Sequence, residues 1–368
     1  MAAGIQRRTR RSSLEASLRE LASLVEAGGG IVAARVSQIL ARPSPTYVGS
    51  GKLVELAQLV RERCLDLVVC DDELKPSQQR AIENALEIKV IDRTALILDI
   101  FATRAKTREG RLQVQLAQSE YLLPRLAGQW AHLERLGGGI GTRGPGEAQI
   151  ETDRRLVRRQ ILTIKKQLEQ VRLQRSQRRQ NRTKNEVQSV SLVGYTNAGK
   201  SALFNWLVRG EVTVRDQLFS TLDTTTRGLY LPSGGETTIN DTVGFVRKLP
   251  PVLVAAFRAT LEELNHSDLL IHVVDANNCE AREQIEVVDS VLSQIGLSNM
   301  PRILVFNKLD LLDDDVDTGN LYSASRSTIR EVKTSAKTGE GVEELRLAIG
   351  EAMRPTTAET GVLGDGAN

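Results

Sequence analysis

The sequence is poor in cysteine, histidine and aromatic residues. Its 368 residues include three cysteines, Cys64, Cys70 and Cys279, with no C-x-x-C pair, and three widely separated histidines. A disulfide framework or a zinc site is therefore not expected, and buried thiols in a reducing cytoplasm account for the cysteines. Because aromatic residues make up only 4% of the chain, stacking on single-stranded bases is expected to be a minor mode of recognition.

Long apolar runs are also missing. No segment approaches the roughly 20 apolar residues that a membrane-spanning helix needs. The basic start, MAAGIQRRTRRSS, is followed by neither an apolar stretch nor a small-residue cleavage site. We therefore expect a cytoplasmic protein without stable membrane insertion, in which residues 1–18 form a disordered basic tail. The net charge of +3 says little about partners, since its distribution matters more.

Residues 19–108 alternate between short apolar segments and helical stretches. The apolar segments are 31–34, 65–70 and 88–91, and the helical stretches are 53–63 and 76–86. This alternation predicts a small α/β subdomain with a parallel sheet. Residues 49–52, Gly-Ser-Gly-Lys, resemble part of a phosphate-binding loop but have Thr46 and Leu53 where glycine and Ser/Thr belong. We interpret them as a turn before a helix.

Residues 109–186 contain two helical series separated by a glycine-rich segment. Mostly apolar residues recur with 4,3 spacing from Leu112 to Leu133 and again from Val157 to Val171. Residues 137–146, between them, hold too much glycine for a regular helix. The pattern predicts an antiparallel helical hairpin with a Gly-rich tip, and Pro124 is expected to kink or interrupt the first helix.

The second helix of this hairpin is strongly basic. Residues 151–187 hold twelve Lys and Arg residues against Glu151, Asp153, Glu169 and Glu186. Such a density of positive charge indicates contact with phosphate groups, and it fits structured RNA recognised by shape and backbone. A solvated coiled-coil face is the simpler alternative. Arg143 in the tip is a candidate for entering a narrow RNA cavity, unless the tip only turns the chain.

Residues 187–353 have the rhythm of a larger α/β domain. The strand-like segments are 189–193, 237–241, 269–275, 303–307 and 331–335, and a helix is expected over 342–353. This order predicts a doubly wound, mostly parallel sheet. Residues 354–368 show no apolar period and are expected to be disordered.

The octet Gly194 to Ser201 matches the P-loop pattern G-x-x-x-x-G-K-[ST] directly after a predicted strand. Its glycines let the backbone wrap around phosphate groups, which then face successive N–H groups and a helix N-terminus. Lys200 is expected to neutralise the β- and γ-phosphates. The Ser201 hydroxyl is expected to bind the Mg²⁺ that bridges them.

Two further motifs complete a Mg²⁺–triphosphate site. Asp241-Thr-Val-Gly244 gives D-x-x-G, in which Asp241 approaches Mg²⁺ through water and the Gly244 N–H meets the γ-phosphate. Upstream, residues 219–223 form a polar loop whose Thr221 completes the Mg²⁺ shell when a γ-phosphate is present. Phe245 stands where Ras-type GTPases have the glutamine that orients the attacking water. We therefore predict slow intrinsic hydrolysis that a partner or another residue accelerates, unless Phe245 packs inward and the backbone alone positions water.

Asn307-Lys-Leu-Asp310 matches N-K-x-D, which distinguishes guanine from adenine. The Asp310 carboxylate can accept both the N1–H and the N2–H₂ of guanine, whereas adenine would leave it unpaired. Asn307 is expected to brace the loop, and Lys308 to lie along the base. A backbone N–H near Ala336 would meet the guanine carbonyl. GTP is thus favoured over ATP, and a P-loop kinase or ATPase is the less favoured class.

These motifs define a predicted site. The catalytic residues are Lys200, Thr221 and Gly244, and the Mg²⁺ ligands are Ser201 and Thr221, with Asp241 acting through water. The nucleotide-binding residues are Gly194, Tyr195, Thr196, Asn197, Ala198, Gly199, Lys200, Ser201, Phe219, Ser220, Thr221, Leu222, Asp223, Asp241, Thr242, Val243, Gly244, Asn307, Lys308, Leu309, Asp310, Ser335, Ala336 and Lys337.

Together with upstream segments, these motifs resemble the HflX family of translation-associated GTPases. The segments that carry the resemblance are 47–52, 92–101, 113–118, 121–126, 136–147 and 219–223. The resemblance implies an α/β subdomain and a helical hairpin ahead of the GTP-binding domain, binding to the large (50S) ribosomal subunit and its RNA, and GTP-dependent splitting or rescue of ribosomes. We expect a monomer without a DNA partner. The alternative is a regulatory GTPase whose hairpin binds a protein.

Overall fold

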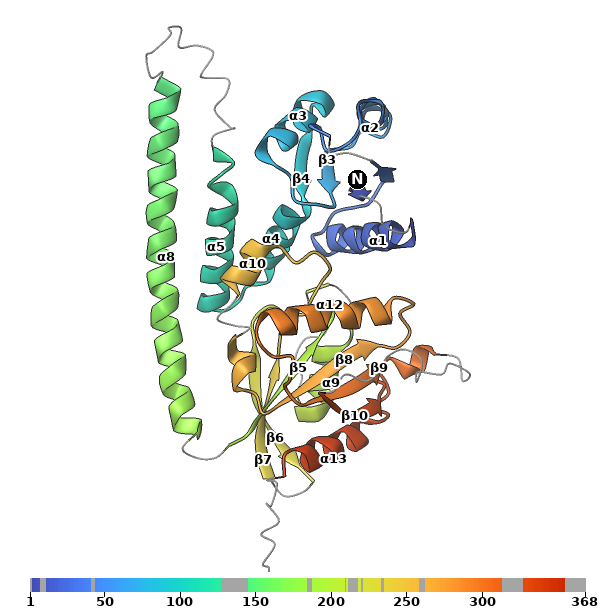
Figure 1. Ribbon diagram of the computed structural model, residues 1–368, viewed down its shortest axis with the longest axis vertical. Helices are drawn as coiled ribbons and strands as arrows, with labels where there is room; N and C mark the ends of the chain where they lie inside the picture. The colour runs from blue at the N-terminus through green and yellow to red at the C-terminus, as the bar shows by residue number, and fades with distance from the viewer. Residues whose placement is uncertain are drawn as a thin grey trace, which may run out of the picture.

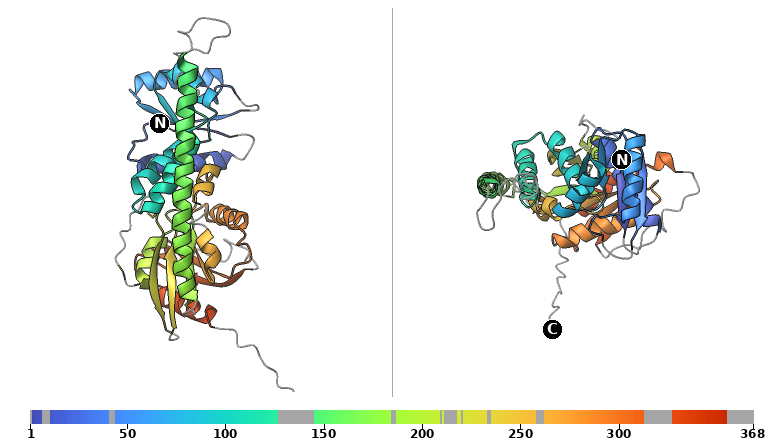
Figure 2. Two further views of the ribbon diagram at one scale, coloured as in Figure 1. Left: turned by 90° about the vertical axis from the view of Figure 1, so that its left-hand side faces the viewer. Right: turned by 90° about the horizontal axis from the view of Figure 1, so that it is seen from above.

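The computed structural model describes residues 2–6, 11–40, 44–126, 145–183, 187–208, 210, 218–219, 221–232, 235–257, 262–312 and 327–354. An amino-terminal α/β part, a pair of helices and a carboxyl-terminal α/β domain follow one another along the chain. The longest of the described helices, α8 (Pro145–Thr183), runs along one side of the molecule beside the other two parts (Figure 1, Figure 2). None of the helices in these ranges is both long and apolar enough to span a membrane.

The amino-terminal part contains the predicted parallel sheet. Its four strands have the order β2-β1-β3-β4, and each neighbouring pair is parallel. In chain order its elements are β1 (Ala2–Gln6), α1 (Arg11–Ala27), β2 (Arg35–Ile39), α2 (Ser50–Glu62), β3 (Leu67–Cys70), α3 (Pro76–Leu86), β4 (Lys89–Asp92) and α4 (Arg93–Arg104). Helix α2 begins at Ser50, directly after Gly49, so residues 50–52 form its first turn, and their interpretation as a turn before the helix is wrong.

The prediction of a disordered tail over residues 1–18 is wrong for most of that range. Residues 2–6 form β1, which pairs with β2 and β3, and α1 begins at Arg11. Leu14, Leu18 and Leu21 are buried, because their spacing of four and three places them on one face of the helix. The many arginines in residues 1–18 made this apolar stripe difficult to recognise in the sequence. Burial of the thiols also holds only for Cys70, since Cys64 and Cys279 are exposed.

Helices α5 (Arg108–Leu122) and α8 form the predicted antiparallel pair (Figure 1). Leu112 and Leu116 of α5 pack with Ile161 and Ile164 of α8 in one apolar cluster. Helix α5 ends two residues before Pro124, as the loss of a backbone donor at proline predicts. Most of the Gly-rich tip, with Arg143, and the tail beyond residue 354 lie outside the described residues, whereas Pro145 and Gly146, predicted to be non-helical, begin α8.

The carboxyl-terminal domain is built on a six-stranded sheet with the order β10-β9-β8-β5-β7-β6. All neighbouring strands are parallel except β6 and β7, so the predicted mostly parallel sheet is confirmed. In chain order the elements are β5 (Ser189–Gly194), α9 (Lys200–Val208), β6 (Thr225–Leu231), β7 (Gly235–Asp241), α10 (Pro251–Ala256), η1 (Glu262–His266), β8 (Leu269–Asp275), α12 (Ala281–Gln294), β9 (Arg302–Asn307), η2 (Leu309–Leu311), β10 (Thr328–Lys333) and α13 (Val342–Ala352). The carboxyl ends of β5, β8 and β9 meet at one edge, where ligands bind in such sheets.

One apolar cluster joins the two α/β parts. It contains Ile97 and Phe101 from α4, Val114 from α5, and Phe219 and Leu222 from the loop that precedes β6. Residues from the segment that follows β7, including Val246 and Leu253, belong to the same cluster. The loops that border the predicted nucleotide site are therefore packed against the amino-terminal part.

Candidate nucleotide-binding site

The P-loop connects β5 to α9 and depends on two glycines. Gly194 has φ +149°, and a Cβ there would lie 2.2 Å from the carbonyl oxygen of Val273 on β8. Gly199 has φ +94°, and a Cβ there would lie 2.1 Å from Nδ2 of Asn307. Both positions require glycine, because a side chain would meet the neighbouring strand or the base-binding loop.

Lys200 is buried at the start of α9. Its Nζ donates hydrogen bonds to the carbonyl oxygens of Gly194 at 3.2 Å and Tyr195 at 2.8 Å. Burial lowers the pKa of Lys200 to about 8, and the nearby Asp241 carboxylate counteracts part of that effect. A desolvated ammonium of this kind favours an incoming anion such as phosphate.

Three oxygen-bearing side chains converge beside Lys200. Ser201 Oγ donates to Asp241 Oδ2 at 2.6 Å and lies 2.6 Å from Thr221 Oγ1. Asp241 is fully buried, and within the described residues its Oδ1 has no hydrogen-bond partner. Burial raises the pKa of Asp241, and hydrogen bonds and the Lys200 charge oppose this. Two hydroxyls and a buried carboxylate with an unused oxygen suit hydrated Mg²⁺, a hard cation that takes oxygen ligands.

The P-loop meets two further loops, which we call switch I (residues 219–223) and switch II (residues 241–245). One cavity is lined by residues from all three loops: Thr196, Asn197, Gly199, Lys200, Ser201, Ala202, Phe219, Thr221, Thr242 and Gly244. At Gly244 a Cβ would lie 2.6 Å from the Cα of Thr196 and 2.9 Å from Nζ of Lys200. The close approach of switch II to the P-loop therefore requires glycine.

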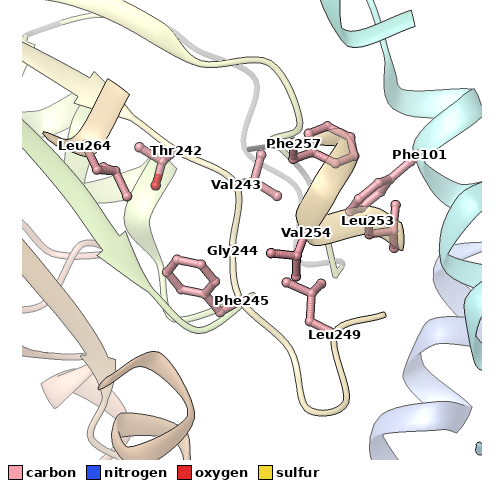
Figure 3. A pocket seen from close by; sticks show the side chains of 10 residues that line it. All are labelled: Phe101, Thr242, Val243, Gly244, Phe245, Leu249, Leu253, Val254, Phe257 and Leu264. Atoms are coloured by element: carbon pink, nitrogen blue, oxygen red, sulfur yellow. The ribbon is translucent and has the colours of Figure 1, made fainter. Parts of the chain in front are cut away.

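Phe245 packs inward, as the first part of the alternative interpretation held. Its backbone N–H donates to Gly194 O at 3.1 Å, and its carbonyl accepts from the Thr196 N–H at 2.7 Å. The ring is buried and lines an apolar pocket together with Leu249, Leu253 and other residues (Figure 3). The Phe245 side chain cannot orient a water molecule, because it carries no polar group.

Asn307 connects the P-loop to the loop after β10 on the base side of the site. Its Nδ2 donates to Ala198 O at 2.9 Å, and its Oδ1 accepts from the Ala336 N–H at 2.9 Å and Thr334 Oγ1 at 3.2 Å. Asn307 is buried, so these contacts also satisfy its polar atoms. The Ala336 N–H, expected to meet the guanine carbonyl, is thus used by Asn307 in this structure.

Asp310 is positioned by the loop after β10. Its Oδ1 accepts from Ser335 Oγ at 2.6 Å, and Lys337 Nζ lies 3.7 Å from Oδ2. The Ser335 hydrogen bond is the main cause that lowers the pKa of Asp310. Lys308, with φ +69°, forms an ion pair of 2.7 Å with Asp275. Sequence reasoning missed Asp275, although its place at the carboxyl end of β8 was a usable signal.

The structure places some predicted residues away from the cavity. The Asp223 carboxylate contacts the N-terminus of α5, and Leu222 is buried in the apolar cluster between the α/β parts. Ser220 lies outside the described residues. Glu20 of α1 was not predicted, yet it accepts a hydrogen bond from the Tyr195 hydroxyl, and the same hydroxyl accepts one from the Arg247 N–H at 2.7 Å. The amino-terminal part therefore touches the P-loop directly.

A P-loop on a six-stranded sheet, a convergent hydroxyl–carboxylate cluster and an N-K-x-D loop define the class of P-loop GTPases. Residues 15–102, 104–182 and 189–308 match the families described as GTP-binding GTPase N-terminal, GTP-binding GTPase Middle Region and 50S ribosome-binding GTPase. The chain is 47% identical over 346 residues to GTPase HflX of Escherichia coli strain K12, covering 93% of this chain and 80% of that protein. It therefore belongs to the HflX family of GTPases.

Two further comparisons agree with this assignment. GTPase HflX of Caldanaerobacter subterraneus subsp. tengcongensis is 48% identical over 336 residues, which cover 91% of this chain and 76% of that protein. A solved structure described as a complex of SsGBP and GDP is similar with a TM-score of 0.52 at 25% identity, covering 95% of this chain and 97% of that chain. The likeness extends over all three parts of the chain.

The Asp310→Asn variant is expected to bind GTP about 10- to 100-fold more weakly. The amide presents a donor to the N1–H and N2–H₂ groups of guanine where the carboxylate accepted them. ATP affinity should stay the same, because adenine makes no use of that acceptor. Fluorescence titrations with both nucleotides measure the two affinities, and exposed Asp66→Asn serves as the control. A parallel loss of both affinities would show that Asp310 does not select the base.

Proposed function

We propose that this chain is a GTP-hydrolysing switch that acts on the large ribosomal subunit during ribosome splitting or rescue. In this proposal Ser201 and Thr221 hold Mg²⁺, with Asp241 acting through water, while Lys200 and Gly244 act on the γ-phosphate. The protein acts as a cytoplasmic monomer with three parts. The α/β subdomain comprises residues 19–108 together with the rest of α1, the helical pair comprises residues 109–186, and the GTP-binding domain comprises residues 187–353. The basic surface of α8 is the observation that carries the ribosomal part of the proposal.

Helix α8 presents far more positive charge to solvent than its packing needs. It packs on α5 through Ile161 and Ile164, while Arg155, Arg159 and Lys166 are exposed. Its described ion pairs are few and lie at the surface: Arg158 with Glu151, Lys165 with Glu120, and Arg172 with Glu169. A basic helix of 39 residues beside a GTP-binding domain suits the phosphate backbone of a large folded RNA.

The position of Phe245 supports a slow intrinsic reaction. Its ring carries no polar group and is buried, so that position supplies no side-chain group to orient water, and only backbone groups there could do so. Binding to the ribosomal particle would then supply or order the missing group. Hydrolysis would be timed by encounter with the particle instead of running freely in solution.

The central experiment measures GTP hydrolysis by the purified chain with and without 50S particles over a series of salt concentrations. We expect the particles to raise the rate, and we expect this stimulation to fall steeply with salt because phosphate contacts release counterions. Purified 30S particles provide the control for non-specific RNA. If 50S particles neither bind the GTP-analogue form nor raise hydrolysis at low salt, the proposal fails.

A charge-matched pair of variants tests the role of α8. The triple variant Arg155→Gln/Arg159→Gln/Lys166→Gln should weaken binding to 50S particles and reduce the slope of log affinity against log salt by about 1 for each phosphate that the helix no longer neutralises. The control Arg61→Gln/Lys89→Gln/Arg282→Gln removes the same charge from other surfaces. Equal effects of both variants on 50S binding would show that α8 contributes only through the net charge of the protein. Stimulation by a protein fraction free of RNA would favour a regulatory GTPase with a protein partner.

A further inference from the structure

Switch I is attached to the two residues directly before helix α5, one of which caps the helix. The Asp223 carboxylate accepts hydrogen bonds through Oδ2 from the backbone N–H groups of Lys106 at 2.8 Å and Thr107 at 2.9 Å, and through Oδ1 from the Thr107 hydroxyl. Thr107 is also the N-cap of α5, where its Oγ1 accepts from the Gly110 N–H at 3.0 Å. A carboxylate at this place interacts favourably with the positive end of the helix dipole.

Two other residues of switch I, Phe219 and Leu222, are held by the P-loop and the amino-terminal part. The Phe219 N–H donates to Thr196 Oγ1 at 2.9 Å, and the Phe219 ring meets Phe101 edge-on with centroids 4.6 Å apart. On the other side of Thr221, Leu222 is buried in the cluster that includes Val114 of α5. Thr221 thus stands between two fixed points, and its hydroxyl lies 2.6 Å from that of Ser201.

We propose that Asp223 is a positioning residue: its contact with the N-terminus of α5 holds Thr221 in the Mg²⁺ site and makes closure of switch I and the seating of α5 a single equilibrium. This inference rests on the proposed function, in which GTP and Mg²⁺ occupy the cavity. It adds that the helical pair senses the γ-phosphate through switch I, chiefly through the Asp223 carboxylate, without any contact between α8 and the nucleotide.

The proposal separates GTP from GDP. With GTP bound, Thr221 would help to hold the Mg²⁺ beside the γ-phosphate, whereas GDP has no γ-phosphate to make that contact necessary. Breaking the hydrogen bonds of Asp223 should therefore weaken the binding of GTP more than the binding of GDP. Because coupling between two sites is reciprocal, GTP should in turn stabilise the first turn of α5.

Gly110 permits a test that leaves Asp223 in the chain. A Cβ at Gly110 would lie 2.2 Å from Asp223 Oδ1, which is the end of a flexible side chain that can move away. The new Cβ would also lie 3.2 Å from Thr107 Oγ1, but alanine has a higher helix propensity than glycine, so Gly110→Ala should release Asp223 with little change in the stability of α5. Gly51→Ala is the matched control, since Gly51 lies in the first turn of α2 and a Cβ there has no neighbour within 4 Å.

The experiment compares the affinity of the purified full-length variants for GDP and for a non-hydrolysable GTP analogue at saturating Mg²⁺. We expect Asp223→Ala and Gly110→Ala to lower the ratio of analogue to GDP affinity about 10-fold, within the usual range of coupling between sites. GDP affinity and thermal stability should change little, and Gly51→Ala should match the unmodified protein. Thr107→Ser, which keeps the hydroxyl donor, should retain the ratio, whereas Thr107→Val should lower it.

Hydrogen exchange of the backbone amides reports the other half of the equilibrium. In the unmodified protein the GTP analogue should slow exchange over residues 108–112 relative to GDP, and in Asp223→Ala this difference should vanish. An unchanged affinity ratio in both Asp223→Ala and Gly110→Ala would overturn the inference. If the unmodified protein itself fails to bind the GTP analogue, the proposed function fails instead, so the two failures are distinguishable.

Discussion

The Arg93→Met variant is expected to unfold with a free energy about 3 kcal/mol lower than that of the unmodified chain. Arg93 is almost completely buried, and its guanidinium donates to Asp71 Oδ1 at 2.9 and 3.1 Å and to Glu20 Oε1 at 2.6 Å. It also donates to the carbonyl oxygens of Arg247 at 2.9 Å and Ser17 at 3.3 Å. Methionine has a similar shape but no donor, so the loss would come from acceptors left without their partner.

The expected loss lies at the lower end of the range for breaking a buried ion pair, about 3–5 kcal/mol, because Lys248 still contacts Asp71 at 2.5 Å. Urea unfolding followed by circular dichroism measures it. Arg19→Met is the control, since the exposed pair of Arg19 with Glu280 should contribute less than about 1 kcal/mol. Similar losses of unfolding free energy in both variants would mean that the buried contacts of Arg93 stabilise the protein no more than an exposed ion pair does.

This cluster also bears on the nucleotide site. Glu20 accepts hydrogen bonds from both Arg93 and the P-loop residue Tyr195, and Arg93 reaches the backbone of Arg247 just after switch II. Burial and the nearby Glu20 carboxylate raise the pKa of the Tyr195 hydroxyl, which therefore stays a neutral donor. The two α/β parts are thus joined by polar contacts at the P-loop and at switch II, in addition to the apolar cluster.

Much of the fold could be predicted from local patterns. The strand expected over residues 269–275 is Leu269–Asp275, and the helix expected over 76–86 is Pro76–Leu86, because a buried apolar run and a proline at the start of a helix are local signals. Strand β6 (Thr225–Leu231) was missed. It contains arginine, glycine and three exposed positions in a row, and antiparallel pairing with β7 defines it.

The phosphate and base loops were predictable for a different reason. Gly194, Lys200 and Asp310 lie in short motifs whose spacing determines the backbone shape that the chemistry needs. The contacts of Asp223 with Thr107 and of Tyr195 with Glu20 have no such spacing, since they join positions 116 and 175 residues apart. They depend on how two domains pack, and a single sequence carries no periodic signal for that.

The Lys200→Ala variant is expected to bind GTP more weakly by about 2–5 kcal/mol, or roughly 30- to 5000-fold in Kd, the cost of truncating one partner of a buried charged contact. Lys200 Nζ is the buried cation beside the cavity, and alanine leaves the phosphate charge to backbone N–H groups and Mg²⁺. The control is Lys52→Ala. Lys52 ends the Gly-Ser-Gly-Lys segment that resembles part of a phosphate-binding loop, but it pairs with Glu55 on α2. Isothermal titration with GTP measures both variants. An equal loss for Lys52→Ala would place phosphate recognition in the amino-terminal part, whereas an unchanged Lys200→Ala would leave the P-loop lysine without its expected role.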